Sequence, residues 1–462
     1  MELRRGDKVV YARLDTPHAV LSTARANGGY RADLLYLLNH QVCEPSGHGG
    51  GKAMLGYTDP GRYLEDICQR YGLGPASRCA ALSTAANMRL CAVEAETYRE
   101  LTVAAAVTAG VEGNAGRAGD PASGYEGRNG YEAVRRLGVA EEAHPAPGRE
   151  GQAHPPDPRG AGSAASPSAA VSAGLPAGAE GGGGPPDVAR PAPPPAALAG
   201  EAGGAGARGD PPDPSDPPPH GTINTLLFIS LPVTPGCLTR AVMTATEAKT
   251  AALQELNINS RYSDGLATGT GTDQIAVAAR FLEGFPPLSS AGKHAKLGEL
   301  VGVTVKAAVK GALQRQNGLS PSRQCSAKIL LERLFEREGV YRITRDEIAE
   351  LFSRDMDPET AALFQANSKA ALCDPAVAAA VAALMHLRDQ FSWGTFPPLL
   401  WPEIMGAQAA LLAAAAGGDL GKSEGYRGRL AGLSADASRE GFTRLVGAAL
   451  AMGYSDKWEK GI

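Results

Sequence analysis

Residues 267–273 read ATGTGTD and combine three threonine hydroxyls with a carboxylate in a turn rich in glycine. Glycine lets a backbone approach a ligand closely, and the hydroxyls of Thr268, Thr270 and Thr272 can both donate and accept hydrogen bonds. Asp273 closes the turn, directly before an apolar run. We expect these threonines to bind a substrate and Asp273 to be a catalytic carboxylate, because such a loop suits substrate binding or the orientation of a nucleophile.

A second candidate lies where the sequence Gly221-Thr222-Ile223-Asn224 opens an apolar stretch. One interpretation is an ordinary strand that begins with threonine, a residue that favours β structure. The alternative makes Thr222 a nucleophile that attacks an amide carbonyl. Asn224 or loop N–H groups would then stabilise the oxyanion.

The glycine-rich stretch at residues 107–120 carries Glu112 and Asn114. A loop of small residues after a strand brings backbone N–H groups close to a ligand. We expect Glu112 to be a second catalytic carboxylate and Asn114 to bind substrate, while a plain glycine turn is the alternative. The stretch is no dinucleotide fingerprint, because no suitable helix follows it.

Charged residues on two predicted helices complete the candidates. Glu247 and Lys249 stand two positions apart in the string TEAK, so they do not share a helix face. We expect Glu247 to act in acid–base catalysis, and Lys249 and His294 to contact the substrate. The alternatives are a solvated charged face and a surface histidine at a helix start. No second His or Cys stands near His294 at metal-ligand spacing, so we expect no metal.

The hydrophobic pattern predicts an α/β protein with layered sheets and helices. Its catalytic domain is formed by two halves, residues 1–138 and 220–319. We predict strands at residues 8–13, 19–22, 79–83, 101–109 and 222–231, and helices at residues 30–39, 62–71, 235–256 and 296–314. The apolar run at 274–281 fits either a strand or a helix.

Two further regions have a different character. Residues 139–219 are Pro, Gly and Ala with few large apolar side chains, which predicts a disordered insert that loops out of the domain. Residues 320–462 show helical patterning and form a predicted helical C-terminal region, to which we assign no chemistry.

Composition narrows the function classes. A net charge of −4 argues against a nucleic-acid-binding protein, which would usually be basic. We expect no leader, because the N-terminal stretch lacks an apolar run, and no membrane span, because the Ala-rich run at 409–416 is too short. The seven cysteines form no CxxC pair, so we expect buried thiols in a cytoplasmic protein. The sequence does not predict an oligomeric state.

Several strings occur in the order typical of a known family. The strings are LSTA (21–24), LNHQ (38–41), STAAN (83–87), TAGVE (108–112), GTINT (221–225), TEAK (246–249), ATGTGTD (267–273) and GKHAKLGE (292–299). On these the chain resembles the adenosylcobinamide amidohydrolase (CbiZ) family. The resemblance implies hydrolysis of adenosylcobinamide to adenosylcobyric acid and (R)-1-aminopropan-2-ol in corrinoid salvage. The corrinoid is then the substrate, and no cofactor is implied.

A weaker resemblance concerns layout. A Gly-Thr step into a strand, a Pro-containing turn and a helix starting Leu238-Thr239-Arg240 resemble the self-processing amidases of the DmpA aminopeptidase and ornithine acetyltransferase group. In that group the chain cuts itself before a Ser or Thr, which becomes an N-terminal nucleophile. Two alternatives stay open beside the corrinoid amidohydrolase: a non-catalytic corrinoid-binding protein, and a self-processing amidase with another substrate.

Overall fold

The computed structural model describes residues 1–42, 59–122, 124–127, 130–133, 221–334, 345–354 and 356–459. The chain divides into one compact unit of Met1–Ala122 with Pro214–Ile462, and a second of Ser123–Asp213. Within the second unit the structure describes a hairpin of β10 (Gly124–Gly127) and β11 (Gly130–Ala133). The predicted insert at 139–219 lies outside the described residues, and the domain boundaries stay predictions.

A six-stranded sheet with β12 near its centre is the larger of the two main sheets. The strand β12 (Ile223–Ile229) is buried along its whole length, as a run of β-branched and apolar residues predicts for a strand covered on both faces. It runs antiparallel to β8 (Leu101–Ala109) and parallel to β14 (Gln274–Arg280). The edges are completed by β7 (Ala92–Tyr98) on one side, and by β3 (His18–Ser22) and β4 (Gly29–Arg31) on the other.

A second sheet of four strands packs against the first. Its order is β1 (Glu2–Arg5), β2 (Val9–Arg13), β5 (Tyr36–Gln41) and β6 (Cys79–Thr84). Alternating side chains from both sheets meet in one apolar layer, in which Leu37 and Leu82 contact the region of Leu226 and Phe228. This alternation is what the period of two along a strand dictates.

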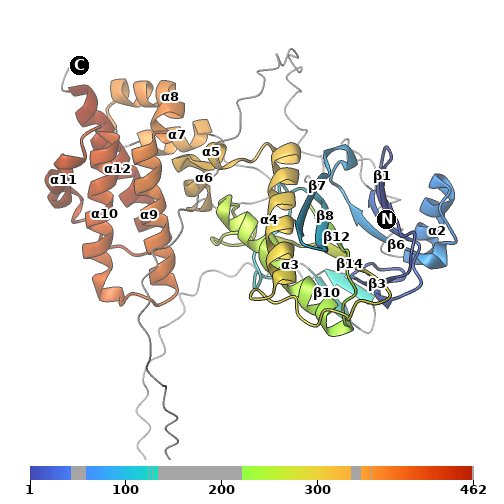
Figure 1. Ribbon diagram of the computed structural model, residues 1–462. Coiled ribbons are helices and arrows are strands. Elements are labelled where there is room, and N and C mark those ends of the chain that lie inside the picture. Colours follow the sequence, from blue (N-terminus) through green and yellow to red (C-terminus); the bar gives the residue numbers. More distant parts are fainter. Residues whose placement is uncertain are drawn as a thin grey trace, which may run out of the picture. The chain divides into compact units, whose positions relative to one another are not determined.

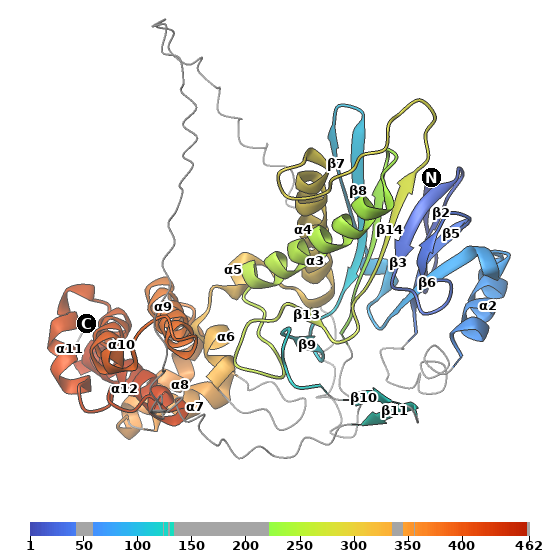
Figure 2. The same ribbon diagram turned by 90° about the horizontal axis from the view of Figure 1, so that it is seen from below.

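Helices cover the two outer faces. α2 (Pro60–Tyr71) lies on the smaller sheet, where Leu64 and Ile67 are buried. α3 (Pro235–Glu255) and α4 (Lys296–Asn317) lie on the larger sheet and on each other. Figures 1 and 2 show the resulting order of layers: helix, sheet, sheet and a helix pair. The predicted α/β class with layered sheets and helices is therefore confirmed.

One element prediction is wrong. Residues 30–39 do not form a helix, because they contain the end of β4 and the start of β5. Short apolar runs such as Leu34 to Leu38 fit a buried strand as well as a buried helix. Pairing decides here: β5 runs parallel to β6 and antiparallel to β2, so its backbone groups are satisfied within the sheet.

The C-terminal region is helical, as predicted, and has its own core around Phe364, Met405 and Phe442. Its helices are α5 (Pro321–Gln324), α6 (Ala327–Leu331), α7 (Arg345–Ser353), α8 (Pro358–Leu372), α9 (Pro375–Ser392), α10 (Trp401–Ala416), α11 (Ser423–Leu430) and α12 (Arg439–Glu459).

The segment Pro398–Ala416 is longer than its alanine run suggested. By length and hydropathy alone it is apolar enough to cross a membrane, and α8 with α9 pass the same test only as a pair bent by 81°. Such a test is also passed by core helices, and Met405, Ala409 and Leu412 are buried against the neighbouring helices. Burial in the helical core thus accounts for the apolar character of α10.

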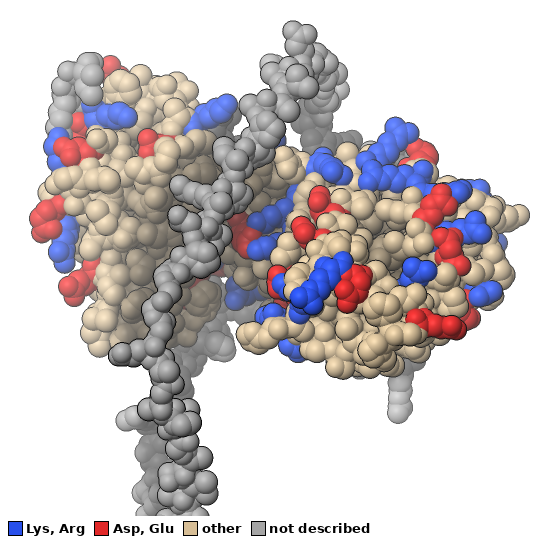
Figure 3. Space-filling model, in the orientation of Figure 1, with Lys and Arg blue, Asp and Glu red and all other residues tan. Residues whose placement is uncertain are grey.

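The cysteines agree only in part with the prediction of buried thiols. The six cysteines in the described ranges are free, and four are buried as predicted, whereas Cys325 and Cys373 are exposed. Burial raises the pKa of the Cys91 thiol to about 11, so it stays protonated at neutral pH. On the face drawn in Figure 3, basic and acidic side chains are interspersed over the described surface.

A buried histidine makes folding sensitive to acid. His40 on β5 is 6% exposed and its Nδ1 lies 2.8 Å from the hydroxyl of Tyr63 on α2. Burial, helped by the charges of Arg70 and Lys8, lowers the pKa of His40 from 6.5 to about 4. Below pH 6.5 the unfolded chain therefore takes up a proton that the folded chain does not bind, and folding weakens.

We therefore expect the free energy of unfolding to fall by about 3 kcal/mol as the pH drops from the unfolded to the folded pKa of His40. The loss should begin near pH 6.5 and be complete near pH 4. Urea unfolding across this range, with the curve of His40→Gln subtracted, measures the effect. Parallel curves for the two proteins would contradict it.

Candidate active site

Asp273 is the centre of a network that joins three elements at one end of the larger sheet. Its Oδ1 accepts hydrogen bonds from the backbone N–H of Ile223 at 2.9 Å and the hydroxyl of Thr270 at 2.6 Å. Its Oδ2 accepts from the backbone N–H of Thr270 at 3.0 Å and pairs with the ammonium of Lys249 on α3. Both charged side chains are largely buried, at 16% and 14% exposed. A carboxylate that accepts from four donors is placed to hold these three elements together.

Close backbone approach explains the glycines of the turn. β13 (Gly269–Thr270) pairs with β9 (Ala115–Gly116) and brings the turn beside α3. A Cβ on Gly269 would lie 2.5 Å from Asp273 Oδ2 and 2.7 Å from Lys249 Nζ. Glycine at position 269 therefore leaves room for the ion pair.

The carbonyl of Gly221 is held by two side-chain donors beside a third hydroxyl. Asn114 donates from Nδ2 to the Gly221 oxygen at 3.1 Å, and the hydroxyl of Thr272 donates to the same oxygen at 3.3 Å. The hydroxyl oxygens of Thr222 and Thr272 lie 2.7 Å apart. The three side chains thus surround one peptide carbonyl with two donors and a potential nucleophile.

The donor roles of Thr222 and Thr272 are linked, because either hydroxyl can donate in the bond between them. Thr272 has a single hydroxyl proton, so when it donates to Gly221 it must accept from Thr222. The Oδ1 of Asn114 accepts from the hydroxyl of Tyr262 at 2.9 Å, which leaves the amide NH₂ to face Gly221. The result is a chain of hydrogen bonds from the Thr222 hydroxyl, through Thr272, to the carbonyl oxygen.

Asn224 is not part of this cluster. It is fully buried between the two sheets and donates from Nδ2 to Asn39 Oδ1 at 2.9 Å and to the Ser83 carbonyl at 3.0 Å. Its Oδ1 is buried and has no partner among the described residues. Both its amide protons are occupied, so the structure places the amide donor for the carbonyl on Asn114 and not on Asn224.

The remaining candidates lie apart from Thr222 or at its margin. Glu247 is exposed on α3 and pairs with Lys293 at 2.6 Å, and His294 is exposed in the turn that precedes α4. Glu112 is half-buried on the loop that carries Asn114. Thr268 accepts from the backbone N–H of Ala118 at 2.9 Å and so fixes the next loop. The structure therefore does not bring Glu247 or His294 to the cluster.

Tyr262 was not predicted, although it orients Asn114. No local pattern marks it, because its role depends on the pairing of β9 with β13, which brings together segments far apart in the sequence. Among the described residues no group of three or more His, Cys, Asp or Glu side chains is arranged to hold a metal ion.

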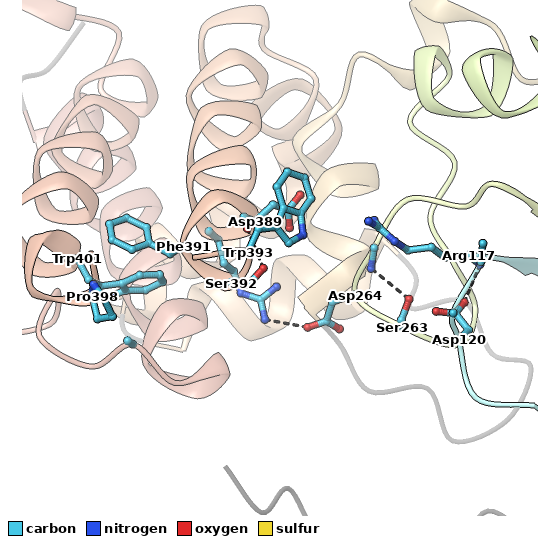
Figure 4. A pocket seen from close by; sticks show the side chains of 15 residues that line it. Arg117, Asp120, Ser263, Asp264, Asp389, Phe391, Ser392, Trp393, Pro398 and Trp401 are labelled. Atoms are coloured by element: carbon cyan, nitrogen blue, oxygen red, sulfur yellow. Dashed lines mark hydrogen bonds and ion pairs between the residues drawn. The ribbon is translucent and has the colours of Figure 1, made fainter. Parts of the chain in front are cut away.

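A cavity of about 620 Å³ lies beside the loops of the cluster. Figure 4 shows its walls: Arg117, Asp120 and Asp264 from these loops, and aromatic side chains that include Trp393 and Trp401 from the helical region. The Arg117 guanidinium lies 5.9 Å from the centre of the Trp393 ring, and Arg388 binds Asp264 at 2.8 Å. None of the residues around the Gly221 carbonyl lines the cavity, but loop 117–120 joins the two places through the bond from Ala118 to Thr268.

Comparison with known proteins decides the family. A model of the adenosylcobinamide amidohydrolase family matches residues 1–148 and 195–321. The chain belongs to the adenosylcobinamide amidohydrolase (CbiZ) family. The matched ranges contain Asn114, Thr222, Lys249 and Asp273, and they end where the helical region begins. The family resemblance seen in the sequence is thereby confirmed, and the family is one of hydrolases.

A relative in Methanocaldococcus jannaschii, the uncharacterized protein MJ1613, is 44% identical over 98 residues. The aligned part is 21% of this chain and 37% of the relative, so the chain matches little more than a third of that protein's length. This relative therefore gives no information on the reaction of this CbiZ-family protein, and the geometry of the protein's own residues is the guide.

The ion pair of this CbiZ-family site gives a testable stability effect. Asp273→Asn leaves the largely buried ammonium of Lys249 without its counter-ion, and we expect a loss of about 3 kcal/mol in unfolding free energy. The double variant with Lys249→Met should recover part of the loss, since it removes the unpaired charge as well. Glu247→Gln is the matched control on the same helix, because its exposed pair with Lys293 should contribute less than about 1 kcal/mol. Equal losses for Asp273→Asn and Glu247→Gln in urea unfolding would contradict the structural role of Asp273.

Proposed function

We propose that this protein hydrolyses the aminopropanol amide of adenosylcobinamide, giving adenosylcobyric acid and (R)-1-aminopropan-2-ol. The observation that carries the proposal is an amide carbonyl, that of Gly221, bound by Asn114 and Thr272 beside the hydroxyl of Thr222. The same three groups suit a substrate amide, because acyl transfer needs a nucleophile and donors aimed at one oxygen. The family supplies the corrinoid as the substrate class.

In the proposed mechanism Thr222 Oγ1 attacks the carbon of the substrate amide. The developing oxyanion takes the position of the Gly221 oxygen and is stabilised by Asn114 and Thr272. Collapse breaks the C–N bond and releases 1-aminopropan-2-ol, whose nitrogen takes up the proton that the Thr222 hydroxyl gave up on attack. The corrinoid acyl group remains as an ester on Thr222. Water then hydrolyses the ester, which gives the carboxylic acid and restores the hydroxyl.

The network around Asp273 argues against the competing route, in which a carboxylate activates water. Asp273 already accepts four hydrogen bonds, and Glu247 is exposed on the far side of its helix turn from Lys249. Glu112 shares the loop of Asn114, so among the predicted carboxylates it is the one that would activate water in that route. The hydroxyl of Thr222, in contrast, lies beside the two donors that hold the Gly221 carbonyl, which favours the covalent route.

The surroundings suit a large amphiphilic substrate. We place part of the corrinoid in the cavity lined by Arg117 and Trp393, since an aromatic and cationic wall offers both apolar contact and hydrogen-bond donors to its rim of amides. The corrinoid is the substrate and not a resident cofactor in this proposal. We also propose that the reaction takes place in the cytoplasm.

Mass spectrometry of adenosylcobinamide incubated with the purified protein tests the proposal. Adenosylcobyric acid in many-fold excess over the enzyme, with an equal amount of aminopropanol, is the expected result. A stoichiometric shift of the corrinoid absorption spectrum without aminopropanol would instead show a binding protein. Turnover of small aminoacyl amides but not of the corrinoid would point to an amidase with another substrate.

A further inference from the structure

Thr222 cannot reach a substrate in the intact chain. The residue is 4% exposed, and its nitrogen is tied in the peptide bond to Gly221. The carbonyl of Gly221 also occupies the two donors, Asn114 and Thr272, that the substrate oxygen needs. The intact chain therefore holds one of its own peptide bonds where the proposed function requires the substrate amide.

We propose that Thr222 cleaves the Gly221–Thr222 bond of its own chain and so becomes the N-terminal residue of the fragment 222–462. The inference rests on the proposed role of Thr222 as nucleophile and adds a maturation step before the first turnover. The reacting carbonyl, its two donors and the nucleophilic hydroxyl are all in place in the structure.

The chemistry balances without an external reagent other than water. Thr222 Oγ1 bonds to the Gly221 carbon while its proton passes to Thr272, and the proton of Thr272 passes to the carbonyl oxygen. The C–N bond then breaks, the Thr222 nitrogen takes the proton, and an ester between Gly221 and Thr222 remains. Water hydrolyses that ester, which leaves the Gly221 carboxylate, the free hydroxyl and a free α-amine.

The backbone on both sides of this bond is fixed. A Cβ on residue 221 would lie 2.4 Å from the carbonyl oxygen of Gly110, so only glycine fits there. The carbonyl of Thr222 accepts from the N–H of Gly110 at 3.1 Å, and the N–H of Ile223 donates to Asp273 at 2.9 Å. Holding the reacting atoms in one geometry is what makes an intramolecular attack efficient.

The two fragments would stay assembled after the cut. β12 follows Thr222 and lies between β8 from the first fragment and β14 from the second. β14 pairs in turn with β3 of the first fragment. The freed α-amine then lies next to its own hydroxyl, where it can act as the general base for the attack on a substrate. Cleavage thus both opens the carbonyl position and completes the nucleophile.

Intact-mass analysis and N-terminal sequencing of the denatured full-length protein test the inference. We expect two fragments whose masses sum to that of the intact chain plus one water, the second starting Thr-Ile-Asn. Thr222→Ala should remain uncut, Thr222→Ser should still cut, and Asn114→Ala should cut more slowly. Thr225→Ala, three positions further on in β12, should cut like the wild type and shows that the loss of a nearby hydroxyl does not by itself prevent cleavage.

The outcomes separate this inference from the proposed function. An uncut wild-type protein that hydrolyses adenosylcobinamide overturns the self-cleavage and leaves the amidohydrolase standing. A cut protein without turnover supports the self-cleavage and overturns the proposed substrate. Cutting of the folded Thr222→Ala variant at the same bond overturns the inference, because an external protease would then be responsible. Circular dichroism checks whether Thr222→Ala folds. If it does not, the cleavage of Thr222→Ser is measured with and without hydroxylamine, which attacks esters and should speed the cut. No acceleration would overturn the inference.

Discussion

Replacing Thr222 with Ala should reduce kcat for adenosylcobinamide by at least about 10⁴-fold, since loss of the covalent nucleophile in a serine protease lowers kcat by about 10⁶-fold. The variant should also stay uncut, so the Gly221 carbonyl keeps Asn114 and Thr272 occupied. We therefore expect KM to rise, because only the cavity is left to bind the substrate. Steady-state kinetics with aminopropanol release as the readout measures both constants.

Thr222→Ser and Thr225→Ala are the matched variants for this prediction. Serine keeps a hydroxyl at the same place and should retain measurable turnover. Thr225 is buried three positions further along the same strand segment, at 4% exposed, and its replacement should affect stability more than kcat. Full activity in Thr222→Ala would contradict the covalent route and move the reaction to a water activated by a carboxylate such as Glu112.

Two strands that carry the site could be predicted because they are buried on both faces. β8 and β12 are runs of apolar and β-branched residues that predict buried strands. The similar run of β14 fitted a strand or a helix, and its pairing with β12 and β3 decides for the strand. The edge strands β1 and β7 went unpredicted, since they are polar and mostly exposed and take their conformation from pairing. Residues 36–41 could not be assigned to a strand from the sequence alone, because their apolar run fits a buried helix as well as a buried strand. Pairing with β2 and β6 decides for the strand.

Of the candidate site, too, one part could be predicted from local sequence and another part depends on pairing between distant segments. The turn at 267–273 and the Gly-Thr step at 221–222 could be predicted as places of catalytic or substrate-binding residues, because glycine and hydroxyl residues alternate there beside a strand. Which carbonyl they bind could not be predicted, since it depends on the register of β9 with β13 and on Tyr262. Glu247 and Asn224 show the limit of residue type as a guide: one carboxylate is exposed and one amide is buried between sheets.

Replacing Asn114 with Ala should also lower kcat strongly. Asn114→Ala removes a donor to the carbonyl oxygen, and we expect kcat to fall by about 10²- to 10³-fold, the usual effect of deleting one oxyanion donor. KM should stay nearly constant if the bond strengthens mainly in the transition state. The kinetics must be expressed per molecule with a free Thr222 amine, because the same donor serves the cleavage of the chain.

Tyr262→Phe distinguishes a donor from a residue that only orients it. It removes the hydroxyl that fixes the Asn114 amide, yet leaves the amide in place. The fall in kcat should then stay within about tenfold, in line with one neutral hydrogen bond of about 1 kcal/mol. A loss for Tyr262→Phe as large as that for Asn114→Ala would show that Tyr262 itself meets the substrate. Unchanged kcat in Asn114→Ala, with the chain cut, would remove Asn114 from the oxyanion site and leave Thr272 as the donor there.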